Sequence, residues 1–301
     1  MDLRPLESLM WRAPSAHNTQ PWTLIYGDDS IEVCWDPAYA LPAADPTGRD
    51  LRLSMGAFVE TALIAARDLS FEAELAGHRV GWLVAGRYET DFTSADLRDR
   101  RTNRGPYEAG RLRESIVADL NELATVHVLD TRQVAGLMVD ADRHMFSSVP
   151  ITDELRQWLR LTPTHPSYDR DGLTDRALAL SRTEAVGLRT ALALHRPLHR
   201  VGLPAALAAA SRSLLAYDGS VLVLEGPSDP AGQVEAGRAL MRLWLTLTRY
   251  GLACHPLSQI IDCLATRTTL AATLGTDPAR LLHVARVGRP LVHATVSPRR
   301  K

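Results

Sequence analysis

Lysine is almost absent from this 301-residue chain, because the only one is the last residue, Lys301. All other basic side chains are arginine or histidine. The sequence therefore excludes chemistry that needs a lysine inside the fold, such as a Schiff base, a P-loop or a kinase-type phosphate contact. A bound anion has to be held by arginine, by hydroxyl groups or by backbone N–H groups.

Several other features are missing. The formal net charge of −1 provides no overall field that would attract nucleic acid or an anionic membrane. No apolar run reaches the ~20 residues that a membrane span needs, and the N-terminus has no secretory signal. Cys34, Cys254 and Cys263 lack CxxC spacing. We therefore expect a cytoplasmic protein with free thiols and no metal, which binds a small molecule and neither nucleic acid nor membrane.

Hydrophobic periodicity predicts helices that alternate with strands. Helices are expected over residues 3–12, 49–69, 112–124, 132–148, 152–161 and 232–250, and strands over 22–26, 31–35, 71–75, 80–85, 125–129, 217–225 and 280–287. Thr152 is the expected cap of its helix. Gly56 lowers helix propensity, which indicates a close approach by a neighbouring helix or by a ligand. The pattern favours an α+β or α/β architecture with helices covering a central sheet.

Two segments depart from this pattern. Residues 162–212 contain Pro163, Pro166 and Gly172, followed by Ala/Leu-rich stretches. We interpret them as a largely helical insertion that would lie over a pocket. The basic tail, residues 297–301, is expected to be disordered.

The segment RAPSAHNTQPW, residues 12–22, is a loop stiffened by two prolines and rich in hydrogen-bonding side chains. It suits a flat ligand with polar edges, and it equally suits an ordinary turn that leads into a hairpin. The turn RRTNRGPY, residues 100–107, combines three arginines with Thr102. Guanidinium groups bind phosphate bidentately, although a solvated basic turn explains the same pattern.

A third polar loop, HPLSQ, contains Pro256, Ser258 and Gln259 on a stiff backbone. It is expected to follow the helix over 232–250, which ends at Gly251, a natural helix C-cap. A fourth element, Arg286–Pro290, closes the predicted final strand.

These four pieces resemble a known family. APSAHNTQPW resembles the APS-x-x-N-x-Q-P-W signature of nitroreductase-fold flavoproteins, and RRTNRGPY is similar to their Arg-Arg-Ser/Thr-x-Arg turn. GLACHPLSQ resembles their Gly-Leu-x-x-x-Pro loop, and RVGRP resembles their last strand. The order of the pieces is similar to that of the Acg-type subfamily, in which two nitroreductase-like halves are fused in one chain. The resemblance implies an α+β fold with a central mixed or antiparallel sheet, an N-terminal half at 1–98 and a C-terminal half at 99–301.

The resemblance also implies an FMN cofactor between the two halves. Pro14, Ser15 and Asn18 would border the isoalloxazine ring, and Pro256, Leu257 and Ser258 would lie along it near N5. The phosphate would contact arginines and a hydroxyl group: Arg100, Arg101, Thr102, Arg104 and Arg289. The remaining expected cofactor contacts are His17, Gln20, Gln259 and Arg286. Many family members have a lysine at the phosphate, whereas this chain has only arginine to offer.

We therefore expect an FMN-dependent oxidoreductase that transfers hydride through N5 to a nitroaromatic, a quinone or a specialised metabolite, with NAD(P)H as a transient electron donor. His17 or His255 is a candidate proton donor, unless these rings are merely structural. The alternative is a protein that sequesters FMN without turnover, its pocket closed by residues 162–212. A degenerate relative without flavin is a third reading. The chain would be a monomeric pseudo-dimer or would pair again as a homodimer.

Overall fold

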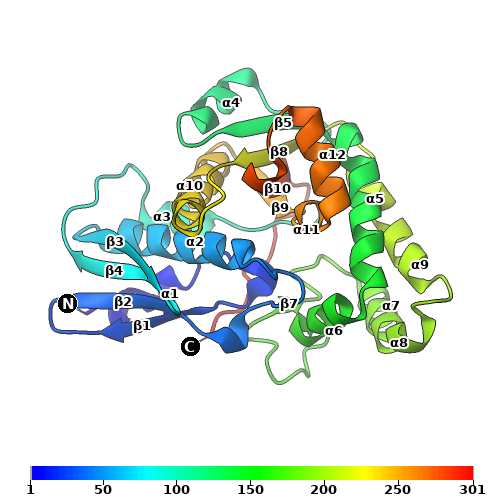
Figure 1. Ribbon diagram of the computed structural model, residues 1–301, viewed down its shortest axis with the longest axis horizontal. Helices are drawn as coiled ribbons and strands as arrows, with labels where there is room; N and C mark the ends of the chain where they lie inside the picture. Colours follow the sequence, from blue (N-terminus) through cyan, green and yellow to red (C-terminus); the bar gives the residue numbers. More distant parts are fainter. Residues whose placement is uncertain (1, 301) are drawn as a thin grey trace.

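The computed structural model describes residues 2–300, in which two four-stranded antiparallel sheets lie on either side of a pair of helices (Figure 1). The first sheet has the order β1-β2-β4-β3, formed by β1 (Trp22–Tyr26), β2 (Ser30–Trp35), β4 (Arg79–Ala85) and β3 (Leu69–Ala76). The second has the order β5-β8-β10-β9, formed by β5 (Val126–Asp130), β8 (Ser220–Glu225), β10 (Leu281–Gly288) and β9 (Ala253–Pro256). Both hairpins predicted from the first hundred residues are confirmed.

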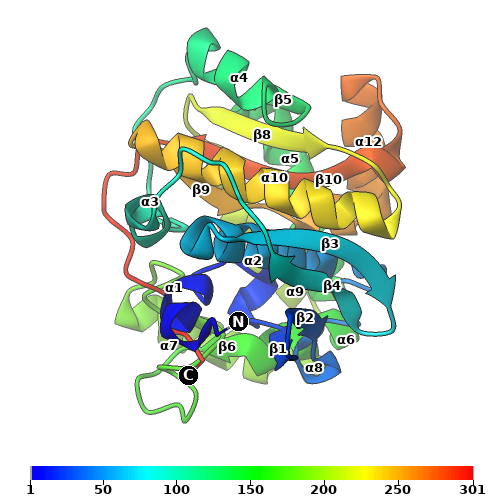
Figure 2. The same cartoon turned by 90° about the vertical axis from the view of Figure 1, so that its left-hand side faces the viewer.

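Each sheet packs on one of two central helices, α2 (Arg49–Ala66) and α10 (Pro230–Arg249). Figure 2 shows the resulting layers: second sheet, α10, α2, first sheet. On the first sheet, Trp22 of β1 stacks on Phe58 of α2 with ring centroids 4.7 Å apart. Helix α10 buries Leu240 and Trp244 against the second sheet, as its helical spacing predicted.

The two central helices touch through glycine. A Cβ atom on Gly56 would lie 1.9 Å from the carbonyl oxygen of Val234, and one on Gly237 would lie 2.3 Å from that of Leu53. Only a residue without a side chain allows the two backbones to approach this closely. The prediction that Gly56 marks a helix contact is confirmed.

A buried charge joins the same two helices. The carboxylate of Glu60 in α2 is completely buried, and it lies 3.0 Å from the guanidinium groups of both Arg238 and Arg242 in α10. Tyr88 donates a further hydrogen bond to it. Because a buried carboxylate without partners would be very costly, this group fixes how α2 and α10 are aligned.

The opposite face of the second sheet is covered by α5 (Thr131–Ser147), α11 (Gln259–Asp262) and α12 (Leu264–Leu274). Helix α5 in turn carries an outer group of helices: α6 (Val149–Trp158), α7 (Arg182–Ala193), α8 (His195–Leu198) and α9 (Leu203–Ala210) (Figure 1). Of the segment 162–212 that was expected to be largely helical, the part from Arg182 to Ala210 contains α7 to α9, whereas residues 162–181 form turns and the short strand Leu173–Thr174. The remaining short elements are α1 (Glu7–Met10), α3 (Ser94–Asp99), α4 (Glu114–Asn121) and the two-residue parallel strands β6 (Leu159–Arg160) and β7 (Leu173–Thr174).

Two local predictions are wrong. Helix α6 begins at Val149, with the Ser148 hydroxyl as its cap and a proline in its first turn, so Thr152 lies inside the helix. The fixed φ of Pro150 suits a helix start and explains the earlier boundary. Residues 253–256, expected as part of a loop, form β9, whose backbone pairs with β10 at the edge of the sheet.

The tail was also predicted wrongly, since residues 298–300 are tied to the N-terminal region; Lys301 lies outside the described residues. The Arg300 guanidinium donates to the backbone carbonyls of Gln20 and Trp22. It also lies over the ring of Tyr39, 3.7 Å from the centroid, and 5.2 Å from that of Trp11. Cation–π contacts of this kind stabilise a charged tail without needing a carboxylate.

Within residues 2–300, no helix is both long and apolar enough to cross a membrane. Cys34, Cys254 and Cys263 are all buried and free.

The glycine contact gives a direct test. We expect Gly56→Ala to destabilise the protein by about 3 kcal/mol or more, because the new methyl group would overlap backbone atoms that cannot rotate away. Gly136→Ala in α5 is the matched control: its methyl group would have no neighbouring atom within 4 Å, so better helix propensity should stabilise it by about 0.5–1 kcal/mol. Urea unfolding measures both, and equal midpoints for the two variants would contradict the contact.

Candidate active site

A pocket of about 260 Å³ lies where the central helices, the opening loop, α5, α6 and the end of β9 meet. Three of the four polar segments singled out in the sequence contribute to its wall. The predicted site residues that line it are Pro14, Ser15, His17, Thr102, Arg104, His255, Pro256, Ser258 and Gln259. Helix α2 adds Asp50, Leu53, Ser54 and Ala57, and α10 adds Leu240 and Trp244. The fold thus brings together segments that are more than 200 residues apart.

The opening loop is strained where it enters the pocket wall. His17, Asn18 and Gln20 have φ angles of +49°, +56° and +55°, in the left-handed region that residues with a side chain rarely adopt. The Ser15 hydroxyl accepts a hydrogen bond from the Gln20 N–H at 2.9 Å, and the Ser54 hydroxyl accepts one from the Ala16 N–H at 3.3 Å. Strain held in place by surrounding bonds is typical of functional loops.

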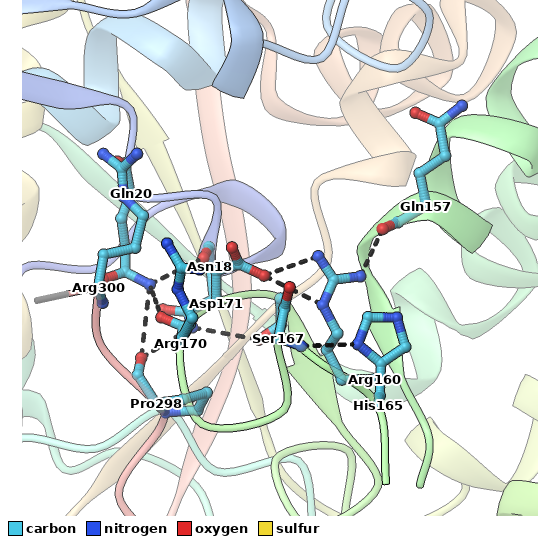
Figure 3. Close-up of polar contacts among 11 residues, drawn as sticks. Asn18, Gln20, Gln157, Arg160, His165, Ser167, Arg170, Asp171, Pro298 and Arg300 are labelled. Atoms are coloured by element: carbon cyan, nitrogen blue, oxygen red, sulfur yellow. Dashed lines mark hydrogen bonds and ion pairs between the residues drawn. The ribbon is translucent and has the colours of Figure 1, made fainter. Parts of the chain in front are cut away.

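Asn18 and Gln20 do not line the pocket; they clamp the loop in place (Figure 3). The Asn18 amide donates to the carbonyls of Gly172 and Pro298, both at 3.1 Å. The Gln20 amide donates to the carbonyl of Arg170 at 3.0 Å, and its oxygen accepts from the Arg300 N–H at 2.8 Å. Their proposed contact with the cofactor is untested, but here they position the loop.

The segment behind the clamp is itself anchored. Arg160 donates through Nε and Nη2 to one oxygen of Asp171, at 3.0 and 2.7 Å, and both side chains are buried (Figure 3). Of residues 162–212, only Leu173 lines the pocket. Helices α7 to α9 pack instead on the outside of α5 and α6.

A cluster of guanidinium groups adjoins the pocket. Arg100 is buried and lies over the ring of Trp244, 5.6 Å from its centroid. Its Nη2 donates to the carbonyl of Arg12 at 3.0 Å, whereas its Nε and Nη1 have no partner in the described part of the chain. Arg299 donates to the same carbonyl and to the Asn18 side chain, and its Nε likewise finds no partner among residues 2–300. Buried donors without partners are rare and indicate a missing acceptor.

No carboxylate in residues 2–300 forms an ion pair with this cluster, which consists of Arg12, Arg100, Arg101 and Arg299. Burial and the neighbouring arginines lower the pKa of Arg100 to about 10 and that of Arg299 to about 9. Mutual repulsion of this kind is relieved by an anion. Sequence reasoning missed Arg12 and Arg299; the doubled arginine after Pro298 was the available signal.

The other predicted residues have different surroundings. Arg101 donates to the carbonyls of Arg98 and Arg100. Arg286 is buried and donates to the carbonyls of Arg104 and Gly105 at 3.0 and 2.8 Å, which braces the arginine turn. Leu257 is completely buried in the core next to α5, so its side chain does not reach the pocket. Arg289 is 58% exposed and faces Glu108.

The pocket has an acidic side that the sequence did not reveal, consisting of Asp45, Asp50 and Asp262. One guanidinium, Arg49, serves two of these: its Nη2 lies 2.7 Å from Asp50 Oδ1 and 2.6 Å from Asp262 Oδ1. Burial, followed by repulsion from Asp50, raises the pKa of Asp262 to about 7 and that of Asp45 to about 6. Arg49 lowers the pKa of Asp50, against the effect of burial.

The pKa values of the pocket histidines are lowered, in contrast to those of Asp45 and Asp262. Burial lowers the pKa of His17 to about 4 and that of His255 well below its usual value. His283, which also lines the pocket, has a pKa lowered to about 4 by burial. His255 accepts a hydrogen bond from Arg286 at 3.0 Å, which requires a neutral ring nitrogen. These rings are therefore neutral near pH 7.

Comparisons with known proteins agree with the motifs. No family model matches the chain. It is 29% identical over 303 residues to a Mycobacterium tuberculosis protein named "Putative NAD(P)H nitroreductase Rv3131", covering 94% of this chain and 84% of that protein. It is 27% identical over 299 residues to the M. tuberculosis protein named "Putative NAD(P)H nitroreductase acg", covering 93% and 86%.

A solved structure, that of the FMN-dependent nitroreductase NfnB from Mycobacterium smegmatis in complex with NADPH, matches with a TM-score of 0.35 and 18% identity. The match covers 65% of this chain and 86% of that one. Because the TM-score and the identity are both low, no conclusion is based on this match. The sequence relatives are sufficient to confirm the resemblance: over nearly its whole length, this chain is similar to two mycobacterial proteins named as putative NAD(P)H nitroreductases, one of which is acg.

Proposed function

We propose that this protein is an FMN-dependent oxidoreductase of the nitroreductase kind. The observation that carries the proposal is the cluster of Arg12, Arg100, Arg101 and Arg299, in which Arg100 is buried and with which no carboxylate of residues 2–300 forms an ion pair; it adjoins a pocket with many apolar lining residues. FMN has the matching features, namely a phosphate dianion and a flat ring with polar edges. The names of the two mycobacterial relatives support the same reading.

The residues present fit this cofactor. The unpartnered donors of Arg100 and Arg299 would hold the phosphate, with Arg101 and Thr102 beside them and Arg104 facing the ring. Arg299 replaces Arg289 as the residue that would close this site, because Arg289 is turned toward solvent. Pro256 and Ser258 would lie along one side of the ring, and Pro14 and Ser15 along the other.

When bound, FMN accepts a hydride from a donor such as NAD(P)H and passes it on, so the protein supplies position and surroundings. The clamped opening loop holds Pro14 and Ser15 at a fixed place in the wall. Apolar side chains from the helices that cover the pocket exclude water from the same space: Leu53, Leu240, Met145, Ile151 and Leu155. A nitroaromatic, a quinone or a specialised metabolite would occupy the remaining volume.

We further propose that residues 1–98 and 99–301 are two nitroreductase-like halves fused in one chain. Each range contains one four-stranded sheet and one of the two central helices, and the pocket lies between them. The contact between α2 and α10 would then correspond to the interface between two subunits of a homodimer. Such a chain could act as a cytoplasmic monomer or pair again as a homodimer.

Sequestration of FMN without turnover is the second candidate. The tail and the segment 170–172 both hold the opening loop from outside, which restricts how the pocket can open. A cofactor enclosed in this way would be retained without exchanging electrons with NAD(P)H.

Anaerobic reduction separates these two candidates. We expect the purified protein to be yellow and its absorbance near ~450 nm to bleach on addition of NADPH or NADH. If dithionite bleaches the flavin but NADPH and NADH do not, the protein is not an NAD(P)H reductase. That result would favour FMN sequestration or a metabolite dehydrogenase. A colourless protein that stays colourless with added FMN would overturn the cofactor proposal itself.

The arginine cluster gives a second prediction. Arg100→Met and Arg299→Met should each weaken FMN binding about tenfold or more, because each removes charge-assisted bonds worth roughly 1.5–3 kcal/mol. Arg87→Met is the matched control, since Arg87 is 84% exposed and pairs only with Glu89. Equilibrium dialysis of FMN measures the affinities. Arg289→Met decides whether that residue also contributes, and unchanged affinity in both cluster variants would contradict the phosphate site.

A further inference from the structure

Reduction of a quinone or a nitro group consumes a proton together with each hydride. Under the proposed function, on which this inference rests, a group in the pocket has to supply that proton. His17, His255 and His283 are poor sources, because their burial keeps the rings neutral near pH 7. The acidic side of the pocket holds the remaining candidates.

Three carboxyl groups lie close together there, and two of them form ion pairs with a single guanidinium. Asp50 and Asp262 both contact Nη2 of Arg49, and Asp50 also accepts a hydrogen bond from Nε of Arg49 at 3.0 Å. Asp45 accepts a hydrogen bond from the N–H of Leu51 at 2.9 Å. Among residues 2–300, Arg49 is the arginine that forms ion pairs with this group, and Arg52 interacts with Asp45 at longer range. Three carboxylates would therefore leave excess negative charge in a confined space, which favours a proton on one of them.

The hydrogen bonds indicate which carboxyl group that is. Asp50 has the most donors, since Ser258 adds to the two bonds from Arg49, and these favour its ionised form. Asp262 accepts a hydrogen bond only from Arg49, at Oδ1, and no donor among residues 2–300 reaches its Oδ2. Its side chain is 26% exposed and Asp262 lines the pocket, so a proton on Oδ2 can reach a bound molecule.

A second unsatisfied group lies at the same end. His283 lines the pocket near Asp50, is only 7% exposed, and has no hydrogen-bond partner at Nε2 within the described residues. An unpartnered buried nitrogen is costly in a folded protein. A molecule that enters between Asp262 and His283 would therefore meet both a proton donor and a neutral imidazole.

We propose that Asp262 is the proton donor of this pocket, and that Asp45, Asp50 and Arg49 keep it protonated near neutral pH. Reduction of a quinone to a hydroquinone needs a hydride, which carries two electrons, at one oxygen and a proton at the other oxygen, and bound FMN would supply the hydride. The O–H bond of the Asp262 carboxyl group breaks, and a new O–H bond forms at a quinone oxygen, giving the hydroquinone. Asp262 is left as a carboxylate and regains a proton from water at the pocket.

The surroundings of Asp262 support this assignment. Asp50 and Arg49 face it from α2 and Asp45 faces it from the preceding loop, while His144 is the titratable pocket residue contributed by α5. Burial and the two other carboxylates raise its pKa to about 7, and Arg49 opposes them. The arrangement pushes the pKa of Asp50 and that of Asp262 apart, which is the usual sign of a divided acid and base role.

The first test is kinetic. Pre-reduced holoprotein is mixed anaerobically with menadione, and flavin reoxidation is followed between pH 5.5 and 9. We expect the wild-type rate to fall about tenfold per pH unit above pH 7, and Asp262→Asn to be at least about 100-fold slower at pH 6 with a flat profile. Asp262→Glu should restore the pH-dependent limb. Asp140→Asn, a change at a carboxylate that is 61% exposed on α5, should leave rate and profile unchanged.

The second test needs no cofactor. A carboxyl group whose pKa is raised by folding stabilises the protein below pH 4 and loses that contribution as the pH rises toward 7. The thermal midpoint of cofactor-free Asp262→Asn should therefore rise relative to wild type as the pH increases from 5 to 8, whereas the gap for Asp140→Asn should stay constant.

The outcomes are separable. An Asp262→Asn variant with the wild-type pH profile would overturn Asp262 as donor, even if it were slower throughout. A midpoint gap that does not change with pH would show that Asp262 holds no proton near neutrality and would also overturn the proposal. If the protein bound no flavin, the proposed function would fail on its own, and the midpoint measurement would still judge the protonation of Asp262.

Discussion

The backbone contact between α2 and α10 is the constraint on which the rest of this structure depends. Gly56 and Gly237 let the two helices approach until no side chain fits between them, and the buried Glu60 with its two arginines fixes their alignment. Both helices also line the pocket, through Asp50 and Ser54 on one side and Leu240 and Trp244 on the other. The shape of the pocket therefore follows from how closely the two sheets are drawn together.

The opening loop depends on that frame, since its left-handed residues are stable only while other segments hold them. The family resemblance implies that Asn18 and Gln20 contact the cofactor. In the structure, their side chains donate hydrogen bonds to carbonyl groups of the tail and of the segment 170–172. The residues of this loop that line the pocket are Pro14, Ser15, Ala16 and His17. The polarity of the loop thus maintains a strained backbone, and the backbone shapes the site.

Local sequence signals predicted most of the helices and strands, because their hydrophobic spacing and their turn residues are strong. The arginine turn, the HPLSQ loop and the opening loop were found in the same way, and the fold brings residues from all three into one wall. What local signals could not predict was the contribution of distant partners. Arg299 lies in a tail that looks disordered by composition, and its burial depends on Arg12 and Asn18, nearly the whole chain away. Asp262 looks like an ordinary helix residue until Arg49 and Asp50 are placed beside it.

The near absence of lysine has a physical consequence in the two charged regions around the pocket, because arginine is the only strongly basic side chain available there. A guanidinium group stays protonated when buried, so Arg100 and Arg299 can remain cationic at pKa values near 10 and 9, with unpartnered donors for an anion. On the acidic side, the single buried guanidinium of Arg49 cannot neutralise three carboxyl groups. The use of arginine as the buried cation therefore matters on both sides of the pocket. The arginine cluster stays positively charged where a phosphate would bind, and on the acidic side one guanidinium is too little positive charge, so that a carboxyl group would keep its proton.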